Sequence, residues 1–220
     1  MNVNVVNMAS KARPDTGAGA KNPDSYHHGA LREALLTGAR ELLDERGEEG
    51  FSLSALARRL GVSTAAPYRH FADRDALLHA VGDLGYEELR RRLLRADAAA
   101  DGPADTLVGM CAAYLRFAQD NPALFGILFR SRGAHRQSPT GPASFQPLID
   151  AVTEAQRRGV LDSGASPLVL ARSIWAAVHG LAVLHLNGGF AKLGLDDTPE
   201  RLAADTLAAM LRTPEARAPA

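Results

Sequence analysis

Apolar residues recur at helical spacing along most of this chain. Between Gly29 and Gly47, leucine and alanine return every three or four residues, and the same spacing reappears in the longer segment that follows Asp73. Such spacing places the apolar side chains on one face of a helix. A strand would instead alternate apolar and polar residues between turn signals, and the sequence contains no such segment. The pattern therefore predicts an all-α fold.

Two short helical segments lie between the long ones. In the stretch FSLSALARRLGVS, Ser52 is a candidate N-cap for an apolar stripe, and Gly61 ends the helix. Ser63 is a candidate N-cap for the next segment, TAAPYRH, and Asp73 is one for the long helix beyond it. Two short helices joined by a tight glycine-containing turn predict a helix-turn-helix.

A proline interrupts the second short helix. If Ser63 is the N-cap, Pro67 falls at the edge of the first turn, where it removes at most one helical hydrogen bond and its fixed φ suits a helix. Pro67 also biases Ala66 away from the right-handed helical region. We therefore expect a local distortion at this point.

Breaks in the pattern divide the chain into regions. Residues 1–25 are rich in Gly, Ala, Pro and Asn without periodicity, which predicts a disordered arm. The sequence DGP at Asp101 marks a second break, and helical segments follow it at residues 104–120, 122–130, 143–158, 167–187 and 199–211. We expect a helix-turn-helix domain over residues 26–73, a connecting helix over 74–96 and a helical C-terminal domain over 97–220.

The composition indicates a cellular compartment but no class of binding partner. Lys and Arg balance Asp and Glu at 25 each, so the overall charge points to no particular class of binding partner. The single cysteine, Cys111, excludes an intramolecular disulfide framework, which suits a reducing cytoplasm. No signal-like apolar stretch opens the chain, and no run of 18 apolar residues lacks a charge. We expect a cytoplasmic protein, nucleoid-associated when bound to DNA, with no membrane partner.

Charge is nevertheless uneven along the chain. From Arg58 to Arg74, four arginines against one acid give a local charge of +3, and this basic segment coincides with the helix-turn-helix. A positive surface around a short exposed helix attracts the phosphates of DNA, and side chains at the start of that helix reach base edges. The alternative is an ordinary exposed helix in which Tyr68 and Phe71 pack on their neighbours, and for Phe71 we expect this core position.

The segment from Tyr26 to Leu78 resembles the DNA-binding domain of the TetR family of bacterial transcriptional regulators. The resemblance rests on the sequence GVS followed by Tyr68, His70, Phe71 and Leu77 at these spacings. It implies a homodimer with an N-terminal three-helix DNA-binding domain and a helical C-terminal domain for ligand binding and dimerisation. It also implies a repressor that leaves a palindromic operator of double-stranded DNA when a small apolar or amphipathic effector binds.

The resemblance also implies which residues contact DNA. They are Ser52, Ser63, Thr64, Ala65, Tyr68, Arg69 and His70, with Arg74 near a phosphate and with Tyr26 and His27 ahead of the first helix. Pro67 departs from the apolar residue that is commoner in the family. A metal site at His27 and His28 is not expected, because adjacent histidines on a turn point apart and no third ligand lies at a useful spacing.

The C-terminal half carries a second, shorter resemblance. The sequence WAAVHG, from Trp175 to Gly180, resembles the Trp-His-Gly signature of one subgroup of these domains. Trp175 and His179 lie four residues apart and share a helix face, where the alternative is a core tryptophan packed on a satisfied histidine. The ligand pocket that the family implies is predicted to be lined by Met110, Tyr114, Phe117, Phe125, Phe129, Phe145, Leu148, Trp175 and His179.

Dimerisation and catalysis complete the predictions. We expect the helices at 143–158 and 167–187 to meet their mates around a two-fold axis. The chain has no G-x-S-x-G or H-E-x-x-H motif, and Cys111 lies in an apolar stretch typical of an inert thiol, so no enzyme activity, catalytic residue, metal or cofactor is predicted. The alternatives are an all-helical small-molecule-binding protein, an activator that uses the same helix-turn-helix, and a helical adaptor.

Overall fold

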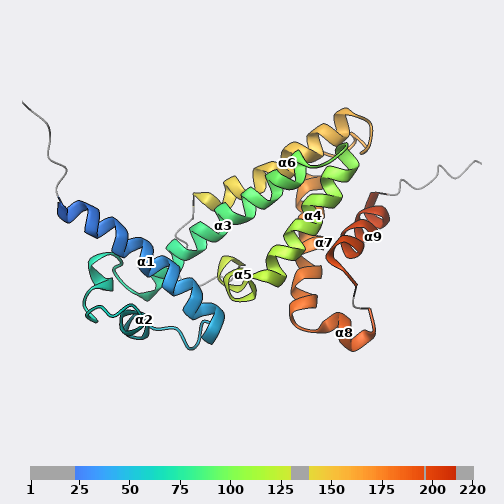
Figure 1. Cartoon of the computed structure of the whole chain (residues 1–220). Helices are drawn as coiled ribbons and strands as arrows, with labels where there is room; N and C mark the ends of the chain where they lie inside the picture. Colours follow the sequence, from blue (N-terminus) through green and yellow to red (C-terminus); the bar gives the residue numbers. More distant parts are fainter. Residues whose placement is uncertain (1–22, 130–138, 196, 212–220) are drawn as a thin grey trace, which may run out of the picture.

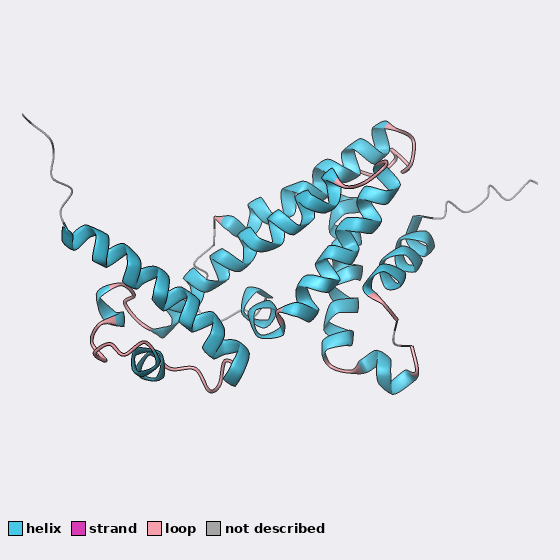
Figure 2. Cartoon of the chain, viewed as in Figure 1, coloured by secondary structure: helices cyan, strands magenta, loops and turns pink. Residues whose placement is uncertain are grey.

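The computed structural model describes residues 23–129, 139–195 and 197–211. Every regular element in these ranges is a helix, and no strand occurs among them (Figure 2). This confirms the predicted all-α fold. The elements are α1 (Pro23–Arg46), α2 (Leu53–Arg59), the 3-10 helix η1 (Pro67–Arg69), α3 (Arg74–Ala98), α4 (Pro103–Asp120), α5 (Pro122–Phe129), α6 (Thr140–Arg157), α7 (Pro167–Leu186), α8 (Gly189–Leu193) and α9 (Pro199–Leu211).

The N-terminal unit consists of α1, α2, η1 and the start of α3 (Figure 1). Leu35, Leu42, Leu56 and Leu77 are fully buried and form its core. Helix α2 crosses α1 closely at Gly38, where an added Cβ would lie 3.1 Å from the Cδ1 atom of Leu56. The packing of these helices therefore fixes where α2 and η1 stand on α1.

Local capping signals set the helix ends in this unit. The Ser52 hydroxyl accepts a hydrogen bond from the Ala55 amide at 3.2 Å, and the Asp73 carboxylate accepts one from the Ala76 amide at 2.7 Å. Gly61 follows α2 in the left-handed region, with φ of 67°, where glycine is favoured over other residues. The predicted N-caps Ser52 and Asp73 are confirmed.

Helix α3 joins the two halves of the molecule (Figure 1). Beyond the N-terminal unit it packs against α4, α5 and α6, while α4 in turn packs against α7 and α9. At Gly85, an added Cβ would lie 2.7 Å from Cδ1 of Leu128, so α3 and α5 are in direct contact there. Because α5 also packs against α1, it lies between the N-terminal unit and the bundle.

The helices differ from the predicted ones in detail. Helix α1 begins at Pro23, so Tyr26 and His27 belong to its first turns rather than preceding it, and their side chains lie outside the described residues. The predicted arm over residues 1–25 falls almost entirely outside them as well. All five helices expected after Asp101 occur, but the short helix α8 was not predicted.

Candidate functional site

The segment after Gly61 forms a turn and a 3-10 helix rather than the predicted α-helix. Ala66 lies in the right-handed helical region, with φ of −63° and ψ of −43°, so the bias imposed by Pro67 does not displace it. The distortion lies in the hydrogen bonding instead, since the Ala66 amide donates to the Ser63 carbonyl and the Arg69 amide to the Ala66 carbonyl. These bonds span three residues, as in a 3-10 helix. Ser63 therefore precedes a turn, and Ala66 occupies the N-cap position of η1.

The same segment separates inward from outward side chains. Ala66 and Pro67 are buried, whereas Tyr68 is 57% exposed and projects to solvent beside Arg69. His70 is half-buried. Four further candidate DNA contacts are also exposed, and they are Ser52, Ser63, Thr64 and Ala65. The turn thus presents small, hydroxyl, phenol and guanidinium groups on one short stretch of chain.

Only part of the positive charge in the basic segment is free of neighbouring carboxylates. The Arg59 guanidinium donates to Glu45 at 2.7 Å and to Glu41 at 3.1 Å, and this hydrogen bonding lowers the pKa of the Glu45 carboxyl. Arg58 and Arg69 are exposed and form no ion pair with any residue that the structure describes. The outward positive charge is therefore smaller than the sequence predicts.

Arg74, predicted to lie near a phosphate, has a structural role. Its guanidinium donates to the Glu48 carbonyl at 2.6 Å and to the Phe51 carbonyl at 3.3 Å, and it lies 5.7 Å from the centre of the Phe51 ring. These bonds tie the start of α3 to the loop between α1 and α2. Part of the guanidinium is thereby bonded to the protein's own backbone, and the predicted phosphate contact stays a prediction.

One basic residue near this surface escaped the sequence prediction. Phe71 is buried, as expected, and the Arg32 guanidinium of α1 lies 5.2 Å from the centre of its ring. Arg32 is itself exposed. It belongs beside Arg69 as a candidate phosphate contact, although only the packing of α1 on the segment after η1 brings it there.

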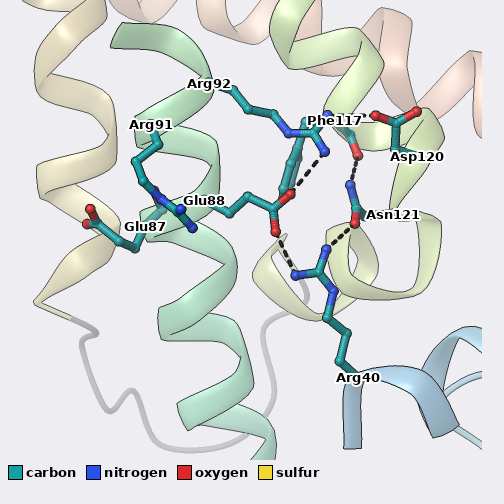
Figure 3. Close-up of polar contacts among 8 residues, drawn as sticks. All are labelled: Arg40, Glu87, Glu88, Arg91, Arg92, Phe117, Asp120 and Asn121. Atoms are coloured by element: carbon teal, nitrogen blue, oxygen red, sulfur yellow. Dashed lines mark hydrogen bonds and ion pairs between the residues drawn. The ribbon is translucent and has the colours of Figure 1, made fainter. Parts of the chain in front are cut away.

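A polar network connects α1 with the bundle (Figure 3). The Arg40 guanidinium donates to Glu88 of α3 at 2.6 Å and to the Asn121 side-chain oxygen at 2.5 Å. Asn121 is buried at the junction of α4 and α5, and its amide donates to the Phe117 carbonyl at 3.0 Å. Burial alone would raise the pKa of Glu88, but hydrogen bonds from Arg40 and Arg92 lower it overall.

Arg92 extends this network along α4. Its guanidinium donates to Glu88 at 2.9 Å and to Asp120 at 2.6 Å, and it lies 5.4 Å from the centre of the Phe117 ring (Figure 3). The network therefore joins α1, α3 and the junction of α4 and α5 through charge-assisted hydrogen bonds.

An apolar cavity of about 440 Å³ lies within the bundle, in the size range of small-molecule sites. Six predicted pocket residues line it: Met110, Tyr114, Phe129, Phe145, Leu148 and Trp175. Three others do not, because Phe117 packs in the core beneath Arg92, while Phe125 stacks on His179 with ring centres 5.4 Å apart. Sequence reasoning missed a wall formed by α3 and the ends of α6 and α7, which includes Tyr86, Leu89, Leu93, Ser144, Leu168 and Arg172.

Trp175, Tyr114 and His179 form a hydrogen-bonded chain beside the cavity. The Trp175 indole donates to the Tyr114 oxygen at 3.3 Å, and that oxygen lies 2.8 Å from Nδ1 of His179. Burial raises the pKa of the Tyr114 hydroxyl and lowers the pKa of His179, so both groups are neutral at neutral pH. Since an indole only donates, the Tyr114 oxygen accepts from Trp175. The direction of the bond between that oxygen and Nδ1 of His179 depends on the histidine tautomer.

Two known protein families match parts of the chain. Residues 35–81 match a family described as "Bacterial regulatory proteins, tetR family", and residues 107–210 match one described as "Tetracyclin repressor-like, C-terminal domain". Together the two matches span more than half of the chain. The chain belongs to the TetR family. The C-terminal description does not name the Trp-His-Gly subgroup, so that assignment stays a prediction.

Relatives of this TetR-family chain agree with the match. A solved structure of a protein of unknown function from Rhodococcus sp. RHA1 is 33% identical, with a TM-score of 0.71, and the alignment covers 86% of this chain and 98% of that one. The HTH-type transcriptional regulator Rv1816 of Mycobacterium tuberculosis is 38% identical over 96 residues, 43% of this chain and 41% of the relative. The class C tetracycline repressor of Escherichia coli is 46% identical over 52 residues, 24% of each chain.

The alignments with the curated relatives of this TetR-family chain are partial. The chain spans less than half the length of Rv1816 and of the tetracycline repressor. Both relatives are regulators by name rather than enzymes. The chain carries the N-terminal helix-turn-helix of this family of regulatory proteins, and its outward groups from Ser63 to Arg69 lie on that motif.

Proposed function

We propose that this regulator is a homodimeric repressor that leaves a palindromic operator when a small molecule enters the apolar cavity. The observation that carries the proposal is that one helix, α3, both lines the cavity and is bonded to the DNA-binding unit. The tetracycline repressor, one of the relatives, is a repressor by name. Binding of a molecule between the helices of a bundle is a common form of small-molecule site.

Helix α3 supplies the physical connection between the two sites. Its residues Tyr86, Leu89 and Leu93 line the cavity, while Glu88 and Arg92 on another face carry the polar network to α1 and α4. A ligand that fits one position of α3 better than another shifts the population toward that position. Because Arg40 is bonded to Glu88, such a shift also moves α1 and the helix-turn-helix that rests on it.

The junction of α4 and α5 supplies a second connection. The Tyr86 hydroxyl donates to the Leu128 carbonyl of α5 at 2.6 Å, and α5 contacts α1, α3 and α4. Asn121, between α4 and α5, accepts from Arg40 of α1. Displacement at the cavity wall therefore reaches α1 from two directions.

Helix α7 offers the surface on which we place the dimer. One face of α7 is buried through Ala171, Ile174, Val178 and Ala182, and the opposite face exposes Val169, Ser173, Ala176, Val183 and Leu184. By length and composition α7 is the single described helix that would suit a membrane span, yet only 22% of its most apolar window is buried within the chain. Small and apolar residues without a charge favour close packing of a second α7 in an isologous interface.

The partner helix in that interface is better assigned to α9 than to the predicted 143–158 helix. Helix α6, which corresponds to the predicted segment, uses Leu148, Ala151, Val152 and Ala155 in its own chain's core. Helix α9 packs against α4 and α7 and leaves Ala208, Ala209 and Met210 exposed. Pairs of α7 and α9 around a two-fold axis would hold two recognition segments on one face of the duplex, spaced by roughly one DNA turn of ~34 Å.

Titration against DNA tests the proposal. Full-length protein is titrated by fluorescence anisotropy with the intergenic duplex upstream of its own gene, at low and moderate salt, with unrelated duplex as competitor. We expect saturable binding that survives the competitor and weakens by roughly 10-fold or more in Arg69→Ala, because a guanidinium contact to a base or phosphate is lost. The matched control is Arg158→Ala. Arg158 is an exposed arginine at the C-terminal end of α6 and pairs with Glu154. Binding that the competitor abolishes, or equal loss in both variants, would contradict the operator assignment.

A further inference from the structure

Arg172 is the single charged residue among the described residues that line the cavity. The other polar lining groups are already bonded within the chain. The Tyr86 hydroxyl donates to the Leu128 carbonyl at 2.6 Å, and the Ser144 hydroxyl donates to the Gly141 carbonyl at 2.7 Å. Burial raises the pKa of the Cys111 thiol to about 12, so that group is neutral as well. The Tyr114 hydroxyl is hydrogen-bonded to Trp175 and His179.

Arg172 itself has no partner among the described residues. Each of the other arginines described beyond Pro103 forms an ion pair, and the pairs are Arg116 with Glu200, Arg157 and Arg158 with Glu154, and Arg201 with Asp205. Arg172 lies one turn after Leu168 at the start of α7, and both residues are exposed while lining the cavity. The guanidinium therefore stands where the apolar cavity meets solvent.

We propose that the cavity binds an amphipathic monocarboxylate, with its apolar body inside and its carboxylate on Arg172. The inference rests on the proposed effector function of the cavity and specifies the chemistry of that effector. A carboxylate placed deep in the cavity would lose its hydration and find no charged partner, which costs free energy. The carboxylate therefore belongs at the mouth of the cavity, beside Arg172. A guanidinium there can hold a carboxylate through two parallel hydrogen bonds.

The residue types in the cavity lining suit a ligand with one charged group and one apolar body. Tyr86, Phe129, Phe145 and Trp175 supply aromatic faces, and leucine, isoleucine, valine and methionine side chains fill the remaining wall. A cationic ligand would meet Arg172 at the entrance and would be repelled. A neutral ligand of the same body fills the cavity but leaves Arg172 in water, so it gains no charge-assisted hydrogen bond.

Trp175 makes the test direct, because it is the chain's single tryptophan and lines the cavity. Its fluorescence is followed while full-length protein is titrated with decanoate and with phenylbutyrate. Decanol and decylamine, which share the decyl chain, serve as the neutral and cationic probes, and all are kept below micelle-forming concentrations. We expect decanoate to bind roughly 10-fold more tightly than decanol, as one charge-assisted hydrogen bond pair at an exposed site provides, and decylamine to bind most weakly.

Substitutions then locate the carboxylate. Arg172→Gln should remove the preference for decanoate over decanol, Arg172→Lys should restore part of it, and Arg158→Gln should leave it intact. Circular dichroism and thermal unfolding establish that each variant is folded. An unchanged preference in Arg172→Gln, or equal affinities for decanoate and decanol in the wild type, overturns the inference.

The failure of this inference can be distinguished from failure of the proposed function. If decanol binds as well as decanoate and both release the operator, the cavity remains the effector site and only the anion assignment is lost. Lack of saturable binding by either carboxylate also overturns the inference. If neither carboxylate nor alcohol changes the Trp175 fluorescence or the operator affinity, the effector role of the cavity fails with it.

Discussion

The DNA-binding unit and the C-terminal bundle use their charged side chains in opposite ways. In the N-terminal unit, Arg59 and Arg74 are bound by neighbouring carboxylates and carbonyls, and the remaining arginines of the basic segment face solvent. In the bundle beyond Pro103, every described arginine except Arg172 forms an ion pair, and Arg172 lies at the mouth of the apolar cavity. Paired guanidiniums therefore orient the helices, while unpaired ones remain available to anions.

The two regions also differ in how they use aromatic residues, and this difference has the largest expected effect on stability. Phe117 is fully buried in the bundle, so Phe117→Ala should lower the free energy of unfolding by about 3–5 kcal/mol. Tyr68 is 57% exposed on the DNA-binding unit, so Tyr68→Ala should change it by less than about 0.5 kcal/mol while weakening operator binding. Urea unfolding and anisotropy on the same preparations measure both quantities. A large stability loss in Tyr68→Ala would place that ring in the core.

The dimer surface comes next in expected effect. An added Cβ at Gly180 of α7 would meet no atom of its own chain within 4 Å, so Gly180→Leu should be accommodated in the monomer yet obstruct a second α7. Sedimentation should then show a shift from dimer to monomer, with operator affinity reduced at low protein concentration. The matched control is Thr153→Leu at an exposed position of α6. If Thr153→Leu separates the dimer and Gly180→Leu does not, the interface lies on α6.

The polar network between the two regions predicts a pH-dependent effect. Hydrogen bonds from Arg40 and Arg92 oppose the effect of burial and lower the pKa of Glu88 below its ordinary value of 4.5. Its contribution to stability is therefore complete above that ordinary value and is lost as the pH falls through the lower value of the folded state. Glu88→Gln should destabilise the protein by about 1–2 kcal/mol at neutral pH, after allowance for solvent screening.

Acid should remove this difference. Thermal unfolding of the wild type and of Glu88→Gln is compared from neutral pH down to pH values well below the ordinary glutamate range. The two unfolding curves should converge as Glu88 becomes protonated. A constant difference across that range would mean that the charge of Glu88 contributes nothing to the network.

The smallest expected effect concerns the basic segment itself. Arg58 is unpaired among the described residues, so Arg58→Gln should lower the dependence of operator affinity on salt by about one phosphate contact. Arg59 is held by Glu45 and Glu41, so Arg59→Gln should change the salt dependence less. Anisotropy titrations over a salt series measure both slopes. Equal slopes for the two variants would show that DNA draws Arg59 away from its carboxylates.

Local signals made much of the DNA-binding unit predictable. The N-caps Ser52 and Asp73, the terminating Gly61 and the buried Phe71 each depend on residues a few positions away. The role of Arg74 depends on carbonyls 23 and 26 residues away, and sequence spacing contains no information about them. The predicted N-cap at Ser63 was wrong although its signal was local. Capping alone favours an α-helix there, but Pro67 makes a turn and a 3-10 helix competitive with it.

The bundle was predictable as a set of helices but not as a site. Periodicity placed all five expected helices, because each buries an apolar face whatever its neighbours are. Which of those apolar residues line a cavity depends on how the helices pack. Phe129 reaches the cavity and Phe125, one turn earlier on α5, stacks on His179 instead. Leu89 and Leu93 of α3 line the cavity although the sequence indicates only a connecting helix.

The cavity has two kinds of wall, and they can be engineered separately. Leu89 and Leu93 stand on α3, whose other face carries the bonds to α1, whereas Ser144, Phe145 and Leu168 stand on α6 and α7, away from those bonds. Substitutions on α6 and α7 can alter which molecule is accepted while the transmission through α3 stays the same. A biosensor with a new analyte and an unchanged output would therefore begin with those three positions.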